Sequence, residues 1–299
     1  MYVFDALKII DIFCKVDDYC QQLDHWLSKL QKSSLCLGNS KRGPKGRLVD
    51  SEVMSILILY HYSGFKCFKY FYKRFVLGPL LSYFPKAPSY NRFIELIPRY
   101  PLLLWGFIHL GFKPQKTGIY YIDSTKLSVC HIRRATSHKV FKGIARHGKT
   151  STGWFFGLKL HMVINQKGQI IALRITPANV ADNNPELLQL LLNGLEGKCY
   201  GDKGYLSKMF EAFFKNGLQI FTKIRKNMKN QLISLQDKAH LQARTVIEMV
   251  FNLLKNYFNI EHTRHRSPDN ALAHTLAGIC AYQFLEDKPA IFKGKNRWK

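Results

Sequence analysis

Ile119-Tyr120-Tyr121-Ile122-Asp123 is the most informative segment of the chain, because a short apolar run ends there in a single carboxylate. Four apolar residues in a row indicate a buried β-strand. Two further strands are expected at 154–164 and 169–175, joined by the turn Asn165-Gln166-Lys167-Gly168, which is a hairpin signal. The pattern of the chain therefore changes at Gly118, and a sheet begins there.

The segments after this hairpin alternate between helix and strand. We expect helices over 183–195, 206–215 and 238–257, and short strands over 198–201 and 219–224. The resulting order is strand, hairpin, helix, strand, helix, strand, helix. That order is typical of a mixed α/β layer architecture.

The residues before Gly118 show helical spacing instead. Asp50 or Ser51 is expected as the N-cap of a helix that runs to about Tyr62. This helix is apolar almost all round, so it should be central. A second helix, Phe65–Phe75, interleaves aromatic side chains with lysines and an arginine. We therefore expect three parts: a helical domain at 1–116, an α/β domain at 117–287 and a basic tail at 288–299.

The charge of the chain points to an acidic partner. Lys and Arg number 45 against 20 Asp and Glu, which gives a net charge of +25 and a pI near 9.8. Nucleic acid is the first partner to expect from such an excess. The longest nearly uncharged apolar stretch, Tyr100–Phe112, is too short for a membrane span of about 20 residues. The seven scattered cysteines form no CxxC pair, which favours reduced thiols in a cytoplasm over a zinc or disulfide framework.

Three carboxylates stand out because acidic residues are scarce. Asp123 and Asp202 each follow a strand, and Glu248 lies in a helix among apolar neighbours. Functional groups in α/β sheets gather at the carboxyl ends of strands, so the two aspartates could meet in one crevice. Each residue alone has a plainer interpretation, as a turn residue or, for Glu248, as a surface pair with Arg244. Asp182 is an alternative to Asp202.

A divalent cation would resolve the repulsion among such carboxylates. Oxygen ligands suit Mg²⁺, with Mn²⁺ able to substitute. Two ions about 3.5–4 Å apart can activate an attacking oxygen and stabilise a leaving oxygen in phosphodiester cleavage. The basic surface would then hold the polyanion, while the few acidic residues hold the metal.

Five motifs in this order resemble a bacterial insertion-sequence transposase with an RNase H-like DDE catalytic domain. The motifs are Tyr121-Ile122-Asp123-Ser124-Thr125, Gly157-Leu158-Lys159-Leu160-His161, Thr176-Pro177-Ala178-Asn179-Val180-Ala181-Asp182, Gly201-Asp202-Lys203-Gly204-Tyr205 and Arg244-x3-Glu248-x6-Lys255. The resemblance covers about 117–285 strongly and 40–116 more weakly. Related transposases often carry Tyr at the position of Leu241.

The resemblance implies that Asp123, Asp202 and Glu248 are catalytic and bind two Mg²⁺ ions. It implies hydrolysis at the transposon ends and attack of the freed 3′-hydroxyl on target DNA. The expected partners are terminal inverted repeats, target DNA and a second copy of the chain on DNA, at the bacterial chromosome in the cytoplasm, with no membrane. The alternatives are an RNase H-like nuclease that cuts without joining and a repurposed, non-catalytic DNA-binding protein.

Cations near these motifs are the expected DNA contacts. Arg244 and Lys255 share a helix face with Glu248. Lys159 and His161 alternate on one strand face, which is either an exposed sheet face or a DNA contact near the metals. The loop at 38–47 would place basic residues on the backbone of the transposon end. The full expected set is Arg244, Lys255, Lys159, His161, Arg133, Arg134, Lys139, Lys203, Lys41, Arg42, Lys45 and Arg47.

Overall fold

The computed structural model describes residues 5–32, 48–150, 153–205, 209–222, 233–261 and 265–291. The chain divides into two compact units. The first comprises Met1–Lys113, Asn256–Ile260 and Arg266–Phe284, and the second comprises Pro114–Lys255, Glu261–His265 and Leu285–Lys299.

The first unit is helical, as expected. Its helices are α1 (Ala6–Lys32), α2 (Asp50–Tyr62), α3 (Phe68–Phe71), α4 (Tyr90–Leu96), α5 (Pro101–Gly106) and α10 (Pro268–Gln283). The shorter 3₁₀ and π turns are η1 (Tyr72–Val76), η2 (Pro79–Ser82), η3 (Ile97–Arg99) and η4 (Phe107–Gly111). Helix α2 is buried along nearly its whole length, which confirms that it is central.

The N-cap of α2 is Val49, and the expectation of Asp50 or Ser51 at that position was wrong. The Val49 N–H donates to the Glu52 side chain at 2.9 Å. Asp50 instead accepts a hydrogen bond from the Tyr100 hydroxyl at 2.8 Å, and Ser51 donates to Asp17. Long-range partners therefore use the polar groups that the local pattern assigned to capping.

Helix α10 packs against α2 in the first unit, although sequence reasoning placed its residues in the 117–287 domain. A buried pair of histidines joins the two helices. His61 Nδ1 lies 2.6 Å from the Phe258 carbonyl oxygen, and His61 Nε2 lies 3.1 Å from His274 Nδ1. Because a carbonyl oxygen only accepts, Nδ1 of His61 carries a proton, and His61 Nε2 is left to share a hydrogen bond with His274.

The second unit is built on one mixed sheet. Its strands are β1 (Ile119–Cys130), β2 (Arg146–Thr150), β3 (Gly153–Asn165), β4 (Ile170–Pro177), β5 (Gly197–Gly201) and β6 (Leu218–Thr222). The order is β2-β3-β1-β5-β6, and β4 also pairs with β3. Strands β1, β3 and β4 are antiparallel neighbours, whereas β5 and β6 run parallel to β1. This is the strand order of an RNase H-like fold, and the expected fold class is confirmed.

Two features of the sheet differ from the sequence-based expectation. Strand β1 does not end at Asp123 but continues to Cys130, because β3 pairs with it antiparallel along that length. The parallel ladder to β5, by contrast, stops at Tyr121. Strand β2 was not anticipated, since its sequence Arg-His-Gly-Lys-Thr has no apolar residue.

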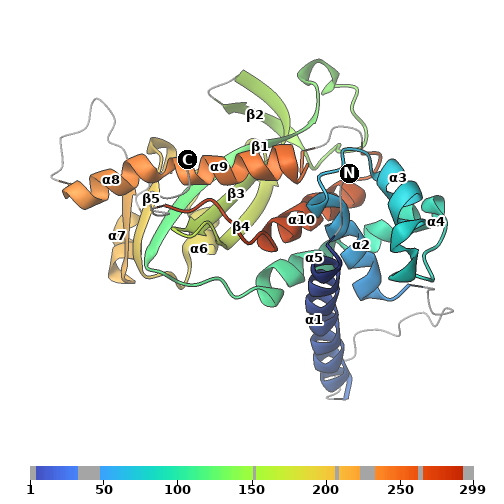
Figure 1. Ribbon diagram of the computed structural model, residues 1–299. Coiled ribbons are helices and arrows are strands. Elements are labelled where there is room, and N and C mark those ends of the chain that lie inside the picture. Colours follow the sequence, from blue (N-terminus) through green and yellow to red (C-terminus); the bar gives the residue numbers. More distant parts are fainter. Residues whose placement is uncertain are drawn as a thin grey trace, which may run out of the picture. The chain divides into compact units, whose positions relative to one another are not determined.

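Helices cover both faces of this sheet (Figure 1). Helix α6 (Pro185–Leu192) packs its leucines on the face that carries Ile122 and Val163. On the other face Tyr121 and Tyr200 stack, and the Tyr121 hydroxyl lies 2.7 Å from His240 Nδ1. His240 belongs to helix α8.

The helix expected over 238–257 is divided into three pieces. These are α8 (Leu235–Ala243), α9 (Thr245–Asn252) and the π turn η7 (Leu253–Tyr257). Ser234 caps α8 by accepting from the Asp237 N–H. Helix α7 (Phe210–Lys215) also belongs to this unit. Among the described helices none has both the length and the apolar character to cross a bilayer.

Candidate active site

Asp123 and Asp202 occupy matching positions on neighbouring parallel strands. Tyr121 of β1 pairs with Tyr200 of β5, and each aspartate lies two residues further along its chain. Side chains alternate along a strand, so Asp123 lies on the same face as Tyr121, toward α8 and α9. Asp202 follows β5 directly and begins a turn that the Tyr205 N–H closes on its carbonyl oxygen at 3.0 Å.

Arg244 links two of the three predicted carboxylates. Its Nη1 lies 2.7 Å from Asp123 Oδ2, and its Nη2 lies 3.3 Å from Glu248 Oε1. The Asp123 side chain is 20% exposed and the Glu248 side chain 56%. The surface pair between Arg244 and Glu248 is therefore present, and it extends inward to Asp123.

The environment of Asp123 favours its neutral form. Burial raises the pKa of Asp123 to about 6, against the opposing effects of Arg244 and of the Ser124 N–H. That N–H donates to Asp123 Oδ1 at 2.8 Å, and the charge of Glu248 raises the pKa further. A carboxylate with this pKa still ionises near neutral pH, so it can bind a cation there.

Asp182 forms a second cluster, in which four of the five motifs meet. Its Oδ1 accepts from the Ser124 hydroxyl at 2.9 Å and from Lys159 Nζ at 3.2 Å, and it lies 3.7 Å from His161 Nδ1. A Cβ placed on Gly204 would lie 3.8 Å from the other carboxylate oxygen. Asp182 is thus tied to the residue next to Asp123 and to the turn that follows Asp202.

His161 is neutral in this cluster. Its side chain is 0% exposed, and burial lowers its pKa to about 4, an effect that the charge of Lys159 strengthens and that of Asp182 opposes. His161 Nε2 lies 2.9 Å from the Thr176 hydroxyl. Lys159 is also buried and donates to the Val180 carbonyl oxygen. Neither side chain lies on an exposed sheet face.

The Gly201–Tyr205 turn packs closely against β1. A Cβ on Gly201 would come within 3.0 Å of the Ile122 side chain, so glycine permits this approach. Tyr205 is buried, and burial raises the pKa of its hydroxyl well above the ordinary value, with Asp123 and Asp182 adding to the effect. Ser124 and Tyr205 lie within two of the sequence motifs, but neither was predicted to have a role in the site.

Lys255 fixes the far end of the Glu248 helix to β1. Its Nζ donates to the Lys126 carbonyl oxygen at 2.5 Å and pairs with Glu261 at 3.0 Å. Glu261 in turn accepts from the Ser128 N–H at 2.8 Å. Lys255 therefore holds the helix against the strand that carries Asp123.

The remaining predicted cations differ in their surroundings. Arg133, Arg134, Lys139 and Lys203 are exposed. The first two lie in η5 (Ile132–Arg134), and Lys203 lies in η6 (Lys203–Tyr205). The predicted contacts Lys41, Arg42, Lys45 and Arg47 lie outside the described residues.

The oxygen atoms that the three predicted carboxylates offer are of the kind that hard divalent cations bind. Asp123, Asp202 and Glu248 offer only carboxylate oxygens, which are the ligands that Mg²⁺ and Mn²⁺ prefer. Within the described ranges, no three His, Cys, Asp or Glu side chains stand close enough together to form a metal-binding group. The structure thus brings Asp123 and Glu248 together through Arg244 and leaves Asp202 as their neighbour on the adjacent strand.

The sheet has the strand order of an RNase H-like fold, and acidic side chains lie on β1, directly after β5 and on α9. A family model described as "Transposase DDE domain" matches residues 113–268, which is more than half of the chain. The chain belongs to this family, the DDE transposases. The matched range contains all five sequence motifs.

Solved structures of the Mos1 transposase are similar to this chain at low identity. The Mos1 strand transfer complex is 12% identical, with 91% of this chain and 88% of that chain covered and a TM-score of 0.23. The Mos1 paired-end complex with the left transposon end is also 12% identical, with 90% and 88% covered and a TM-score of 0.25. Because both TM-scores are low, the fold assignment rests on the strand order. No curated protein matches the chain significantly.

Proposed function

We propose that the chain is the transposase of an insertion sequence, which cuts DNA at transposon ends and joins the freed 3′-hydroxyl to target DNA. One observation carries the proposal. Asp123 and Asp202 lie at matching positions, each two residues beyond the last paired residue of the parallel β1–β5 ladder, and Arg244 ties Glu248 to Asp123. Carboxylates on these three elements, in a chain of net charge +25, suit metal-dependent cleavage of a polyanion.

Each residue of the site has a role in this proposal. Asp123, Asp202 and Glu248 would hold two Mg²⁺ or Mn²⁺ ions. When bound, these ions supply activation of the attacking oxygen and stabilisation of the leaving oxygen. Arg244 neutralises Asp123 and Glu248 and orients both carboxylates. The Ser124 N–H fixes the second oxygen of Asp123.

The exposed cations of the second unit would hold DNA phosphates near the site. Arg133, Arg134 and Lys139 lie in a stretch, Ser124–Ala181, that has no Asp or Glu, and Lys203 directly follows Asp202. Such contacts position DNA without reading its sequence. In this proposal the helical domain at 1–116, including the basic loop at 41–47, binds the terminal inverted repeats. The pairing of two ends implies a homodimer on DNA.

A strand-transfer assay tests the function. Full-length protein is mixed with Mg²⁺, target DNA and labelled duplexes made from the genomic DNA that flanks the gene on each side. Joined product supports the transposase. Nicks without joining would indicate the nuclease alternative, and a gel shift without cleavage would indicate a DNA-binding protein.

Asp123→Asn should abolish cleavage, with a loss of at least about a thousandfold, and should leave DNA binding within about twofold of wild type. Cleavage should be lost because asparagine keeps the shape of the aspartate side chain but lacks the negative charge that would bind the cation. The matched control is Glu211→Gln, which also neutralises one carboxylate but at an exposed i, i+4 pair with Lys215. Near wild-type cleavage by the Asp123→Asn variant would overturn the assignment.

A further inference from the structure

The segment that contains α3 and η1 is anchored by aromatic side chains. Phe71 and Tyr72 are fully buried. The Tyr72 hydroxyl donates to the Pro88 carbonyl oxygen at 2.8 Å, and its ring centroid lies 4.7 Å from that of Phe93. The backbone of this segment is therefore held in place, and side chains on its outer side project from a fixed support.

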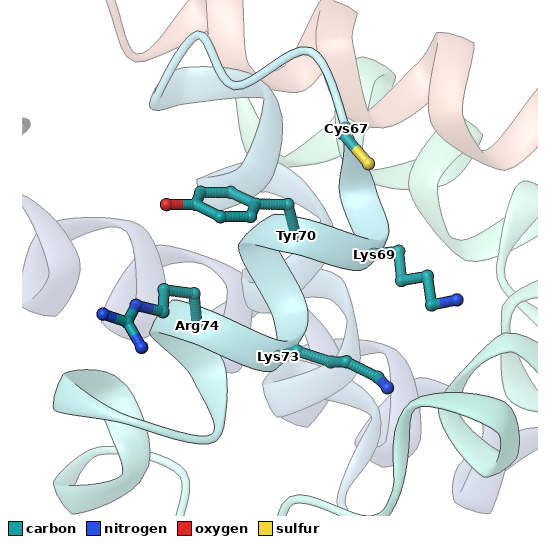
Figure 2. A pocket seen from close by; sticks show the side chains of 5 residues that line it. All are labelled: Cys67, Lys69, Tyr70, Lys73 and Arg74. Carbon is teal, nitrogen blue, oxygen red and sulfur yellow. The ribbon is translucent and has the colours of Figure 1, made fainter.

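The outer side of this segment is basic. Cys67, Lys69, Tyr70, Lys73 and Arg74 line a hollow of about 460 Å³. Figure 2 shows that Lys69 and Lys73 extend in one direction, whereas Tyr70 and Arg74 extend in another. Tyr70 is 54% exposed, so a large part of this residue is accessible to a ligand. We call these five residues the α3 hollow.

The positive charge of the α3 hollow is not compensated. The sequence has no acidic residue between Glu52 and Glu95. Within the described part of the chain, no carboxylate lies within ion-pair distance of Lys69, Lys73 or Arg74. Three cations within two helical turns repel one another, so binding of an anion relieves this repulsion as well as forming new contacts.

We propose that the α3 hollow binds the phosphodiester backbone of DNA. Lys69, Lys73 and Arg74 would contact phosphates, and the Tyr70 ring would lie against a sugar or base. A row of cations on a rigid element suits a polymer with regularly spaced charges. Protein surfaces that bind single-stranded nucleic acid often combine exposed aromatic rings with cations. This inference rests on the proposed function, and it assigns the helical unit a DNA contact outside the basic loop at 41–47.

The first test removes the charge of the hollow. The triple variant Lys69→Gln, Lys73→Gln, Arg74→Gln is compared with a control triple variant, Lys29→Gln, Lys86→Gln, Lys113→Gln, at exposed lysines outside the hollow. Both lose three charges, so a general electrostatic effect is equal in the two. Binding of a mixed-sequence DNA duplex is measured from about 50 to 200 mM salt.

Each lost phosphate contact lowers the slope of log K against log salt by about 0.9. The hollow variant should therefore lose about 3 from the slope and bind roughly tenfold or more weakly at low salt. The slope of the control variant should stay within about 0.9 of the wild-type slope, which is the change expected for one phosphate contact. Equal slopes for the two variants would overturn the proposal.

The second test uses wild-type protein and so does not depend on the folding of a variant. Cys67 lies in the hollow and is exposed, and Cys14 of α1 is exposed outside it. Alkylation of each thiol by a maleimide is followed by peptide mass spectrometry with and without the duplex. DNA should slow the alkylation of Cys67 at least about fivefold and leave Cys14 unchanged, because bound DNA would cover the hollow.

The outcomes separate this proposal from the proposed function. If wild-type protein cleaves and joins DNA but neither the slope nor the Cys67 rate responds, the hollow is not a DNA site and the transposase assignment stands. If wild-type protein neither binds nor cuts DNA, both proposals fail.

Discussion

Asp123 illustrates, at the scale of one residue, how a partly buried carboxylate affects both stability and chemistry. Its pKa is raised by burial to about 6, above its ordinary value of 3.8. The folded protein thus binds a proton on Asp123 more tightly than the unfolded chain does. The resulting stability is fully present below the unfolded pKa and is lost as the pH rises through about 6.

Asp123→Asn removes this dependence. Compared with wild type in the absence of divalent ions, the free energy of unfolding of the variant should gain up to about 3 kcal/mol as the pH rises from below 4 to above 6. Denaturant unfolding at a series of pH values measures the difference. A difference that does not change with pH would show that Asp123 titrates in the folded protein as it does in the unfolded chain.

Asp182 and Lys159 form an ion pair, so the effects of substituting the two residues on the free energy of unfolding should not be additive. Lys159 is 11% exposed at its side chain, so Asp182→Asn leaves a nearly buried ammonium with a weakened partner. We expect a loss of about 2–3 kcal/mol in the free energy of unfolding for this single substitution. Lys159→Met in the same background should recover part of the loss, because it removes the unpaired charge.

A double-mutant cycle gives the measurement for this pair. The coupling between Asp182→Asn and Lys159→Met should reach about 1–2 kcal/mol. The matched control is the exposed pair of Glu211 and Lys215, whose coupling should be at most about 0.5 kcal/mol. Additive effects at Asp182 and Lys159 would mean that the contact contributes no more than a surface pair.

At the scale of elements, Asp237 joins α8 to the sheet. Its carboxylate accepts from Lys198 at 2.8 Å and from the Tyr200 hydroxyl at 2.7 Å, both on β5, and from Ser234 at the start of α8. Burial opposes ionisation, but these hydrogen bonds outweigh it and hold the pKa of Asp237 at about 2. The contribution of Asp237 to the free energy of unfolding therefore changes with pH in the opposite direction to that of Asp123.

Asp237→Asn should lower the free energy of unfolding by about 2 kcal/mol at neutral pH. The stability due to the ionised carboxylate is present above its unfolded pKa of 3.8 and is lost as the pH falls through about 2. Wild type and variant should therefore converge in acid. Thermal melts followed by circular dichroism at neutral and acid pH test this, and an equal difference at both pH values would contradict it.

The elements that sequence reasoning predicted well are those whose own residues specify them. Four apolar residues ending in Asp123 predicted the central strand, and the apolar sequence of α2 predicted burial. Strand β2 and the second half of β1 were missed, because pairing with β3 stabilises them and their own residues do not. The local pattern cannot show such partners.

The candidate site, too, could be predicted only in part from the sequence. Spacing and strand order predicted Asp123, Asp202 and Glu248 as candidates, and the structure ties Glu248 to Asp123 through Arg244. The cluster around Asp182 was not anticipated as a centre. It depends on the cross-strand pairing of Ser124 with His161 and on the turn at Gly204, which only the folded sheet specifies.

At the scale of the whole molecule, the chain leaves the helical unit after Lys113 and returns to it twice, at Asn256–Ile260 and again at Arg266–Phe284, which contains α10. Ala277, Ile279 and Cys280 of α10 are fully buried, and the His61–His274 pair lies between α2 and α10. A Cβ on Gly278 would come within 2.5 Å of Ile260, so this contact is close-packed. The helical unit is therefore discontinuous in sequence.

It follows that a fragment ending at residue 113 or 116 lacks part of its own core. Removing α10 uncovers the apolar face of α2 and leaves the ring nitrogen of His61 without His274. Burial of a single large apolar side chain contributes about 1.5–3 kcal/mol, so losing several exceeds the stability typical of a small domain. The fragment 1–113 should show no cooperative thermal transition and little protection from hydrogen exchange.

The matched control is a linked fragment, in which a flexible Gly/Ser linker joins 1–113 to 256–284 and thereby restores α10. This linked fragment should melt cooperatively, and His274→Ala in it should lower the free energy of unfolding by about 1–3 kcal/mol, because the buried His61 nitrogen loses its hydrogen-bond partner in α10. Circular dichroism melts and hydrogen exchange compare the two fragments directly. Cooperative folding of 1–113 alone, at a stability close to that of the linked fragment, would show that α10 is not part of the core of this unit.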